Sequence, residues 1–325
     1  MERSRPEQVG WLTEFSAAAF ERAARSVVPE LAGLPMSIER GPSFDKPMWA
    51  SGRAVIDGRV FAKLAFSEPT AARIWREAQV LDLLGRRLGL PVPKVVAAHP
   101  RPAFLATERV VGGEPLSYSS VAGLAQTEIG VVASELAHFL STLHATSTLD
   151  LALEEIDDLP RLPDPGLHGS TNELRARFAQ MVDARQGALV LEWCDWIDEQ
   201  LSAPGEAVLV HGDFHPCNQL WQLNEPRLLA VLDLESSGLA EPEFDFMVLP
   251  VFGPGVELLL STIDRYETMS GRRLSVPRIM ALHLRNYLGD ALWRTEAGIG
   301  LPEPGGTPFE YVEQAAGRLA ELELI

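Results

Sequence analysis

Three polar residues at the ends of aliphatic segments carry the clearest chemical signal in the sequence. Asp213 closely follows the aliphatic segment 208–210, and Asn218 lies five residues further along the chain. A second aliphatic segment, 228–232, ends in Asp233. Because both segments have the composition of β-strands, the sequence predicts that two strands of a small ribbon present these oxygen-bearing side chains at neighbouring ends.

Two carboxylates and an amide in this arrangement suit the transfer of a phosphoryl group. One carboxylate can orient and deprotonate an attacking hydroxyl group, while the amide oxygen and the second carboxylate can hold the Mg²⁺ ion that bridges the phosphates. Simpler alternatives exist: Asp213 can cap a helix or turn, and Asp233 can be a turn residue at a strand end. The spacing and the two strands together favour phosphoryl transfer, with Asp213 at its centre.

A lysine within an apolar strand is a further candidate for binding phosphate. Lys63 lies in the segment 60–66, whose other residues are all apolar. A lysine in such a strand is costly unless it has a partner or borders a cleft. Glu77 in the next predicted helix is the expected partner, although Glu68 lies in the same helix. The alternative is a lysine on the solvent side of the strand.

Short strands and one helix are expected to position Lys63. The sequence predicts a helix over 7–27 and then strands at Met36–Arg40, Arg53–Ile56, Arg59–Phe66, Lys94–Ala98 and Phe104–Val111. Asp57 and Gly58 indicate a tight hairpin, because glycine tolerates the positive φ that such a turn requires. Ser67 is the expected N-cap of the helix that interrupts the strands.

The pattern changes after Gly112 and Gly113, where helical periodicity dominates. Helices are expected over 126–146, 173–201 and 277–297, with the strand-and-loop block 207–235 between them and an acidic surface loop at 154–164. We therefore expect an α+β protein of two lobes. The N-lobe (1–111) contains the first helix and five strands, and the C-lobe (112–325) is mainly helical.

The bulk composition excludes several classes of function. The chain has 325 residues, a formal net charge of -17 and a pI of about 4.9, whereas a nucleic-acid-binding protein needs a basic surface. No apolar run is long enough to cross a membrane, the first residues lack a signal-peptide core, and only two cysteines occur. We therefore expect a cytoplasmic protein with no nucleic-acid or membrane partner. The acidic charge aids solubility or, alternatively, steers a cationic substrate.

Longer motifs around these residues resemble the aminoglycoside phosphotransferase family, whose members are small-molecule kinases similar to choline kinase and protein kinases. The matching segments are His211-Gly-Asp-Phe-His-Pro-Cys-Asn218, Val231-Leu-Asp-Leu-Glu235 and Phe244-Asp-Phe246. The resemblance extends from about Met36 to Trp293. It implies a two-lobed kinase-like fold, with a small antiparallel sheet in the N-lobe and acceptor-binding helices in the C-lobe.

The resemblance also implies the roles of the main candidate residues. Asp213 would be the catalytic base, and Asn218 and Asp233 would be the ligands of Mg²⁺. Lys63, paired with Glu77, would bind the α- and β-phosphates of the donor, which is ATP or alternatively GTP.

Supporting roles are implied for residues around this centre. Asp245 would be a buried carboxylate that braces the catalytic loop, and His211 would be a structural residue beneath it. Glu108 and Val110 would bind the base of the nucleotide through their backbone groups, and Ser43 would donate a hydrogen bond to a phosphate.

Two segments depart from the family pattern. The loop Gly41–Trp49, at the place of the family's flexible phosphate-covering loop, contains one glycine and two prolines, so the sequence does not define how it covers the phosphates. Gly212 stands where regulated protein kinases carry an arginine that clamps a phosphorylated loop, and we therefore expect activity without activating phosphorylation. No role is assigned to His215.

The acceptor is expected to be a cationic small molecule, because carboxylates pair with ammonium groups. The candidate acceptor-binding residues are Glu235, Glu241, Asp290 and Glu296. For each of them the alternative is a solvated charged surface. Our first hypothesis is a kinase that inactivates an aminoglycoside or a related antibiotic. The alternatives are a metabolic kinase for an amino alcohol, a sugar or another acceptor, and a nucleotide-binding module without catalysis. The sequence leaves monomer and homodimer open.

Overall fold

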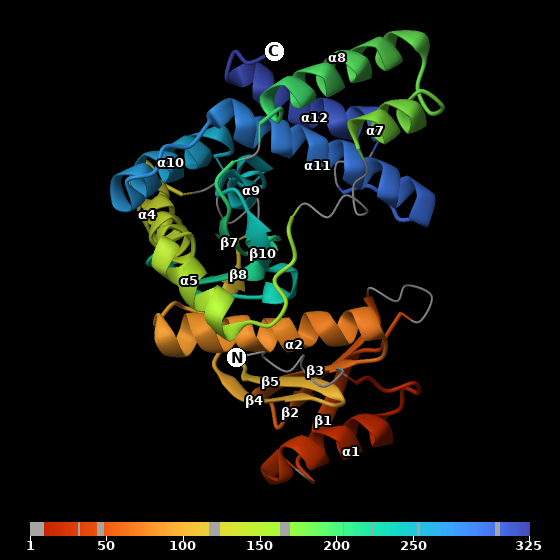
Figure 1. Ribbon diagram of the computed structural model, residues 1–325, viewed down its shortest axis with the longest axis vertical. Coiled ribbons are helices and arrows are strands. Elements are labelled where there is room, and N and C mark those ends of the chain that lie inside the picture. Colours follow the sequence, from red (N-terminus) through yellow and green to blue (C-terminus); the bar gives the residue numbers. More distant parts are fainter. Residues whose placement is uncertain are drawn as a thin grey trace. The chain divides into compact units, whose positions relative to one another are not determined.

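A five-stranded antiparallel sheet organises the N-terminal part of the chain (Figure 1). Its strands are β1 (Met36–Arg40), β2 (Ser51–Ile56), β3 (Val60–Ala65), β4 (Val95–Pro100) and β5 (Ala103–Glu108), in the order β1-β2-β3-β5-β4. All five predicted strands are therefore confirmed, with small changes in their ends. Asp57 and Gly58 form the tight turn between β2 and β3, with φ angles of 50° and 66°.

The structure is a computed structural model, and it describes residues 10–325 except 32, 44–48, 117–123, 163–169, 204, 223, 252–253 and 303–305. The contacts divide the chain into two compact units. The first unit comprises Met1–Pro115, Thr146–Leu159 and Cys217–Ser237, and the second comprises Leu116–Ala145, Pro160–Pro216 and Gly238–Ile325. The expected lobes were continuous stretches of sequence, whereas these units interleave, and Asp233 belongs to the first unit although it lies late in the chain.

The two faces of the sheet have different roles, because side chains alternate along each strand. Helix α1 (Ala17–Val27) covers one face and helix α2 (Glu68–Asp82) covers the other (Figure 1). Even-numbered strand residues such as Ala54, Leu64 and Phe104 join α1 in an apolar core. The odd-numbered residues of the same strands therefore face α2.

The N-terminal helix is shorter than predicted, because it begins at Ala17 and not at residue 7. Ser16 is its N-cap and accepts a hydrogen bond from the backbone N–H of Ala19 at 3.0 Å. Residues 10–12 hydrogen-bond instead to the sheet, through Gly10 N–H to the Pro100 carbonyl and Leu12 N–H to the Ala65 carbonyl. The apolar residues at the start of the pattern thus belong to an extended segment, and residues 7–9 lie outside the described part.

Helix α2 begins where the sequence predicts. Ser67 is its N-cap and accepts from the backbone N–H of Thr70 at 3.3 Å. The first unit also contains the π-helical turn η3 (Leu83–Arg87) and helix α5 (Thr146–Glu155). A second sheet of three strands consists of β6 (Glu114–Pro115), β8 (Gln219–Gln222) and β9 (Arg227–Val231). The 3-10 helices of this unit are η1 (Pro29–Leu31), η5 (Leu234–Ser236) and η4 (Pro216–Asn218), of which the first residue of η4 belongs to the second unit. Strands β8 and β9 are the ribbon that ends near Asp233.

The second unit is mainly helical. Its helices are α4 (Gln126–Leu143), α7 (Thr171–Phe178), α8 (Ala184–Gln200), α9 (Glu243–Phe246), the 3-10 helix η6 (Leu249–Val251), α10 (Val256–Ser270), α11 (Val276–Ala297) and α12 (Pro308–Glu321). Strands β7 (Val208–Val210) and β10 (Gly238–Ala240) form an antiparallel pair. The helix expected over 173–201 is in fact two helices, because Asp183 caps a new one by accepting from Gln186 N–H at 2.9 Å.

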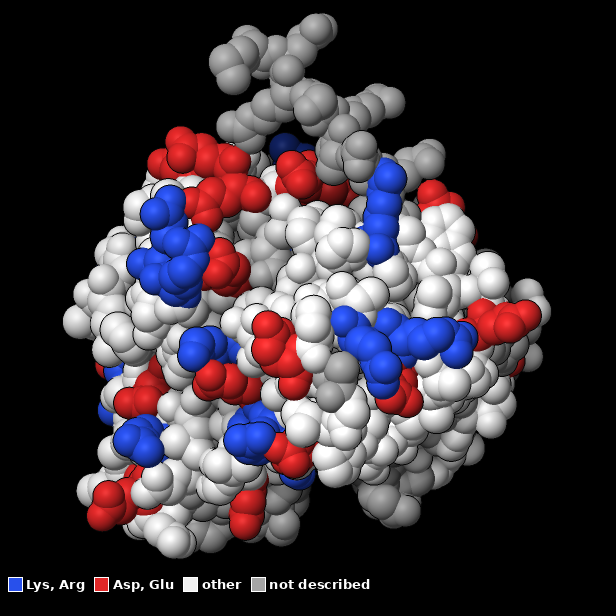
Figure 2. Space-filling model, turned by 90° about the horizontal axis from the view of Figure 1, so that it is seen from below, with Lys and Arg blue, Asp and Glu red and all other residues white. Residues whose placement is uncertain are grey.

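The acidic segment at 154–164 also differs from the expected loop. Glu154 and Glu155 are the last residues of α5, and Arg161 forms a bridge with Leu239. Residues 163 and 164 lie outside the described part. None of the described helices is both long and apolar enough to cross a membrane. Figure 2 shows acidic and basic side chains interspersed over one face of the molecule, so the net charge of -17 does not form a single acidic field there.

Candidate active site

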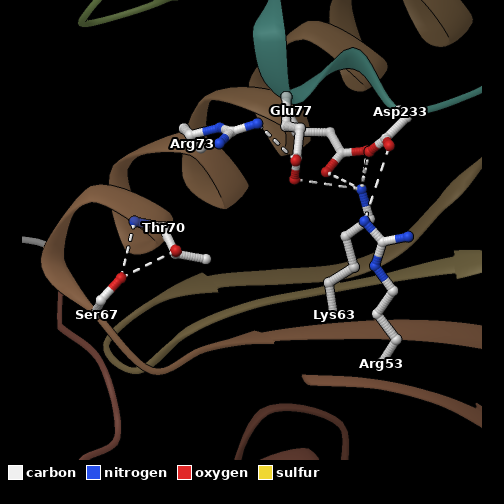
Figure 3. Close-up of polar contacts among 8 residues, drawn as sticks. Arg53, Lys63, Ser67, Thr70, Arg73, Glu77 and Asp233 are labelled. Atoms are coloured by element: carbon white, nitrogen blue, oxygen red, sulfur yellow. Dashed lines mark hydrogen bonds and ion pairs between the residues drawn. The ribbon is translucent and has the colours of Figure 1, made fainter. Parts of the chain in front are cut away.

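The sheet register places Lys63 in a row of side chains on the α2 face. Arg53 on β2 is the cross-strand neighbour of Lys63 on β3, which in turn pairs with Leu105 on β5. Residues at such paired positions point to the same face and lie about 5 Å apart. Figure 3 shows the Arg53 and Lys63 side chains rising together from the sheet towards Glu77 and Asp233.

Lys63 is surrounded by carboxylates within the first unit. Its Nζ lies 2.8 Å from both carboxylate oxygens of Glu77 and 2.6 Å from Oδ1 of Asp233 (Figure 3). The carboxylate of Glu235 lies 3.6 Å away. Burial alone would lower the pKa of Lys63, but these carboxylates together raise the pKa above its ordinary value, so the ammonium group stays charged.

The buried position of Glu77 shifts the pKa of its carboxyl group. Burial is the main cause that raises the pKa of Glu77 to about 7, and nearby Asp233 and Glu235 raise it further, whereas Lys63 lowers it. Glu68, the other acidic residue considered as a partner of Lys63, is exposed in the first turn of α2. The structure therefore brings Lys63 to Glu77.

Asp233 follows β9 in a backbone conformation that few non-glycine residues adopt. Its φ and ψ are 60° and 52°, in the left-handed region, and such strain persists only where the surrounding structure enforces it. Leu232, which directly precedes Asp233, donates its N–H to the backbone carbonyl of Asn218 at 2.7 Å. This hydrogen bond ties Asn218 and Asp233 together in the first unit.

The oxygen atoms near Asp233 form a plausible cation site. Carboxylate oxygens of Glu77, Asp233 and Glu235 lie within 4.8 Å of one another. Carboxylate and amide oxygens are the ligands that Mg²⁺ prefers, so Asp233 and Asn218 fit this ion in chemical type.

A cavity of about 300 Å³ lies in the first unit beside Lys63. Its lining includes Arg53, Lys63, Glu77, Asn218 and Asp233 on its polar side, and Phe61, Leu81, Pro93 and Leu105 on its apolar side. A lining that combines apolar side chains with charged groups suits a ligand that has both a ring system and phosphates.

Glu108 and Val110 also line this cavity, at its β5 end. The Glu108 side chain is exposed and pairs with Lys94 at 2.8 Å, and its backbone N–H donates to the Lys94 carbonyl. Ser43 is half-buried, but it directly precedes residues 44–48, so the loop Gly41–Trp49 lies largely outside the described residues.

The catalytic loop candidate lies in the second unit, after β7. Asp213 is exposed, and its backbone N–H donates to Nδ1 of the buried His211 at 3.1 Å. Gly212 between them has a φ of 83°, which a side chain would strain. Phe214 packs on Phe139 with ring centroids 5.6 Å apart. The loop is thus anchored on both sides of Asp213 while the Asp213 side chain faces outwards.

The buried carboxylate of Asp245 is hydrogen-bonded to the backbone of this loop. Its carboxylate accepts hydrogen bonds from the backbone N–H groups of His211 at 2.8 Å and Gly212 at 2.9 Å, and it is 1% exposed. His144 contributes a third contact, with Nε2 3.1 Å from the carboxylate and Nδ1 3.2 Å from the Tyr266 hydroxyl. The sequence analysis did not identify His144, because a histidine at a helix end has no signal without its partners.

His215 lies close to Asp213 in the same unit. Burial lowers the pKa of His215, and the charges of Asp213 and Asp290 oppose this shift, while Arg294 acts with it. The imidazole is therefore neutral near neutral pH. Asp290, one of these charges, lies on helix α11 in the same unit.

Each of the four acceptor-binding candidates pairs with an arginine, and Glu235 belongs to the first unit whereas the other three belong to the second. Their partners are Arg73 for Glu235 (2.7 Å), Arg278 for Glu241 (2.6 Å), Arg294 for Asp290 (2.7 Å) and Arg177 for Glu296. Asp290 also accepts from the Tyr311 hydroxyl at 2.9 Å.

Two arginines in the first unit belong to the site and were missed by the sequence analysis. Arg73 on α2 reaches Glu235 and also lies over the Trp49 ring, 4.6 Å from its centroid. Arg53 lines the cavity. The alternation of side chains along β2 and β3 was a usable signal for Arg53, since the hairpin at Asp57 and Gly58 fixes its register against Lys63.

Comparison with known proteins agrees with this geometry. The model of the phosphotransferase enzyme family matches residues 50–282. A curated relative, acyl-CoA dehydrogenase family member 11 from Rattus norvegicus, is 27% identical over 189 residues. These residues are 57% of this chain but only 24% of the rat protein, so the chain spans a minor part of that relative's length.

Solved structures of similar proteins share the fold over nearly the whole chain. The GDP complex of wild-type aminoglycoside 2'-phosphotransferase-IIIa has a TM-score of 0.67 at 15% identity, covering 94% of this chain and 98% of the other. Macrolide 2'-phosphotransferase type I has a TM-score of 0.58 at 21% identity, covering 95% and 99%. With the antiparallel sheet, the helical second unit and the family match, the chain belongs to the phosphotransferase enzyme family and is a kinase-type phosphotransferase with the fold of the aminoglycoside phosphotransferases.

Proposed function

We propose that the protein transfers the γ-phosphoryl group of ATP, or alternatively GTP, to a hydroxyl group of a cationic small molecule, namely an aminoglycoside or a related antibiotic. The observation that carries the proposal is the buried lysine: Lys63, held by Glu77 and Asp233, beside a cavity that Asn218 also lines. Burying an ion pair of this kind costs free energy. Binding of the donor phosphates by Lys63 accounts for a charged residue at this buried position.

The donor is proposed to bind in the first unit. Lys63 contacts the α- and β-phosphates, and the apolar walls of the cavity hold the base against the backbone of Glu108 and Val110. Ser43 supplies a further hydrogen bond to a phosphate. Nucleotide complexes are known for a protein of the same fold, as the GDP complex above illustrates.

Mg²⁺ is proposed as the metal, held by Asn218 and Asp233. When bound, it would neutralise charge on the phosphates, which is the chemistry that a hard divalent cation supplies in this class of reaction. The protein's own contribution is to place the Asp233 carboxylate 2.6 Å from the Lys63 ammonium group.

Asp213 is proposed to accept the proton of the acceptor hydroxyl group as that oxygen attacks the γ-phosphorus and the bond to the β-phosphate oxygen breaks. Its backbone is fixed by His211 and, through the neighbouring N–H groups, by Asp245. A base held this firmly can orient the hydroxyl group without further ordering cost. We propose no activating phosphorylation, since Gly212 offers no side chain to read one.

The acceptor is proposed to bind in the second unit near α11. Asp290 is the candidate best supported, because its charge acts on His215 together with that of Asp213. A carboxylate near the base suits an acceptor that carries ammonium groups. Asp290, Glu241 and Glu296 each pair with an arginine, but neither Glu241 nor Glu296 is among the charges that shift the pKa of His215, so they are the weaker candidates.

A metabolic kinase for an amino alcohol, a sugar or another acceptor is the second candidate function. The specific observation in its favour is the rat relative, since an animal protein whose name concerns acyl-CoA is not expected to inactivate antibiotics. The macrolide phosphotransferase of the same fold shows that the fold is also used for acceptors other than aminoglycosides.

A nucleoside triphosphate donor and two free cysteines, Cys194 and Cys217, support a cytoplasmic location.

An acceptor screen tests the proposal directly. Release of ADP or GDP is measured with Mg²⁺ and aminoglycosides, macrolides, cyclic peptide antibiotics, choline and sugars in turn, with the Asp213→Asn variant as the matched control. We expect turnover of an aminoglycoside by the native chain alone. Turnover of choline or a sugar in its place would favour the metabolic kinase, and nucleotide binding without turnover of any acceptor would favour a module without catalysis.

A further inference from the structure

Arg53 is a cation at the donor cavity to which no sequence motif assigns a role. It lies on β2 directly opposite Lys63 on β3, and both side chains line the cavity. Figure 3 shows the two side chains side by side, with the Arg53 guanidinium turned towards Asp233. The question is what a second cation does next to a lysine that already serves this site.

The hydrogen-bonding capacity of Lys63 is already used. A lysine ammonium group has three donors, and the Lys63 Nζ lies within 2.8 Å of two oxygens of Glu77 and 2.6 Å of Asp233. With Glu235 also 3.6 Å away, three carboxylates balance the charge of this lysine. A polyphosphate that contacts Lys63 is therefore bound more strongly if a second cation lies beside this lysine.

Arg53 has the capacity that Lys63 lacks. Its guanidinium lies 3.8 Å from the Asp233 carboxylate, which is an ion pair beyond hydrogen-bond distance. Its Nε is buried and makes no hydrogen bond among the residues that the structure describes. An arginine has five donors, and a buried donor without a partner is costly, so the position points to a ligand that completes it.

We propose that Arg53 binds the phosphate groups of the nucleotide donor, an inference that rests on the proposed function. The planar guanidinium can contact two phosphate oxygens at once, which an ammonium group cannot do. In the sequence of the loop Gly41–Trp49, Pro42 and Pro47 have no backbone N–H to offer a phosphate. Arg53 can supply hydrogen bonds to phosphates from the sheet.

Titration calorimetry with ligands that differ only in phosphate tests this assignment. Adenosine, ADP and ATP, and the same guanine series, are titrated into the native chain and into Arg53→Gln, Arg53→Lys and Arg59→Gln. Arg59 is the matched control, because it lies on the same hairpin, is exposed and does not line the cavity. We expect Arg53→Gln to weaken ADP or ATP binding by about 10- to 100-fold and to leave nucleoside binding unchanged. Arg59→Gln should bind all ligands as the native chain does.

The outcomes separate this inference from the proposed function. If the native chain binds the nucleotides and Arg53→Gln binds them equally well, or loses nucleoside and nucleotide together, the inference is overturned and the proposed function stands. If the native chain binds no nucleotide, both fail. If Arg53→Gln does not fold, Arg53→Lys decides: a loss of at least about threefold for the phosphate-bearing ligands alone supports the assignment, and unchanged affinity overturns it.

Discussion

The two units hold their charged residues in opposite ways. In the first unit, three cations meet three carboxylates, and four of the six side chains line the donor cavity; the six are Lys63, Arg53, Arg73, Glu77, Asp233 and Glu235. In the second unit, the single carboxylate of Asp245 meets backbone N–H groups and one histidine beneath the catalytic loop. The first arrangement is redundant, because half of its members, Lys63, Asp233 and Glu235, have more than one partner in it, whereas the second is not.

This difference suits what each region is proposed to do. Ion pairs can be exchanged when a charged ligand and a metal arrive, since each charge can find a new partner. Backbone hydrogen bonds to a buried carboxylate fix a conformation and leave it unchanged through the reaction. We therefore expect substitutions in the first unit to alter donor binding by graded amounts, and substitutions beneath the loop to have larger effects.

Asp213→Asn should give the largest effect and should separate the two regions cleanly. Removing the base is expected to lower the turnover rate by about two to four orders of magnitude. Nucleotide affinity should stay within about twofold of the native value, because Asp213 does not line the donor cavity. Steady-state kinetics and calorimetry on the same preparation check both halves. A parallel loss of nucleotide affinity would contradict the separation.

Asp245→Asn should destabilise the protein more than any single carboxylate change at the donor cavity. The amide that replaces one oxygen would place a donor against the backbone N–H of His211 or Gly212. We expect a loss of about 2–4 kcal/mol in the free energy of unfolding, measured by urea denaturation, and a lower turnover rate. Asp264→Asn on the exposed side of α10 is the control and should change neither. Equal stability of the two variants would refute the bracing role of Asp245.

His283 extends the comparison to pH. It is buried on α11, with Nδ1 donating to the Met247 carbonyl at 2.7 Å and Nε2 facing Arg318 at 3.4 Å. Burial, and then the charge of Arg318, lower the pKa of His283 to about 3. Below about pH 6.5 the unfolded chain binds a proton at this residue and the folded chain does not, so the free energy of unfolding falls as the pH falls.

The His283→Gln variant should lack this part of the acid sensitivity. Between pH 6.5 and pH 4.5 we expect the native chain to lose about 2 kcal/mol more stability than the variant. Urea unfolding at a series of pH values measures the difference. His138→Gln, an exposed histidine on α4, should follow the native chain. Parallel curves for the native chain and His283→Gln would show that His283 is protonated in the folded state.

The sequence predicted the sheet and Lys63 well, and the reasons are local. The strands between Met36 and Glu108 are short apolar segments with a hairpin marked by Asp57 and Gly58, and these features depend on neighbouring residues alone. The helix over 7–27 was wrong at its start because residues 10–12 bond to the sheet, and such tertiary contacts leave no periodic trace. The split of 173–201 depended on a cap at Asp183 within an otherwise helical pattern.

The partners of the catalytic residues were predictable only in part. Glu77 could be inferred because a buried lysine needs a carboxylate nearby in the chain, but Arg73 and His144 serve partners 162 and 101 residues away. Glu235, which the sequence offered as an acceptor-binding candidate, meets Lys63 and Arg73 in the first unit. A single sequence shows that an acidic residue is present; only the fold shows which charge it meets.

Glu77→Gln should have the smallest effect, and its size tests the redundancy of the donor cavity. Asp233 lies 2.6 Å from the Lys63 ammonium and can hold it when Glu77 becomes an amide, whose oxygen still accepts one hydrogen bond. We expect a loss of about 0.5–1.5 kcal/mol in stability and a three- to tenfold weaker affinity for ADP, as estimated from the worth of one hydrogen bond. Glu68→Gln on the same helix is the control and should change neither quantity. A loss as large as that of Asp245→Asn would mean that Glu77 alone holds Lys63, and the contrast between an exchangeable cluster and a fixed brace would no longer hold.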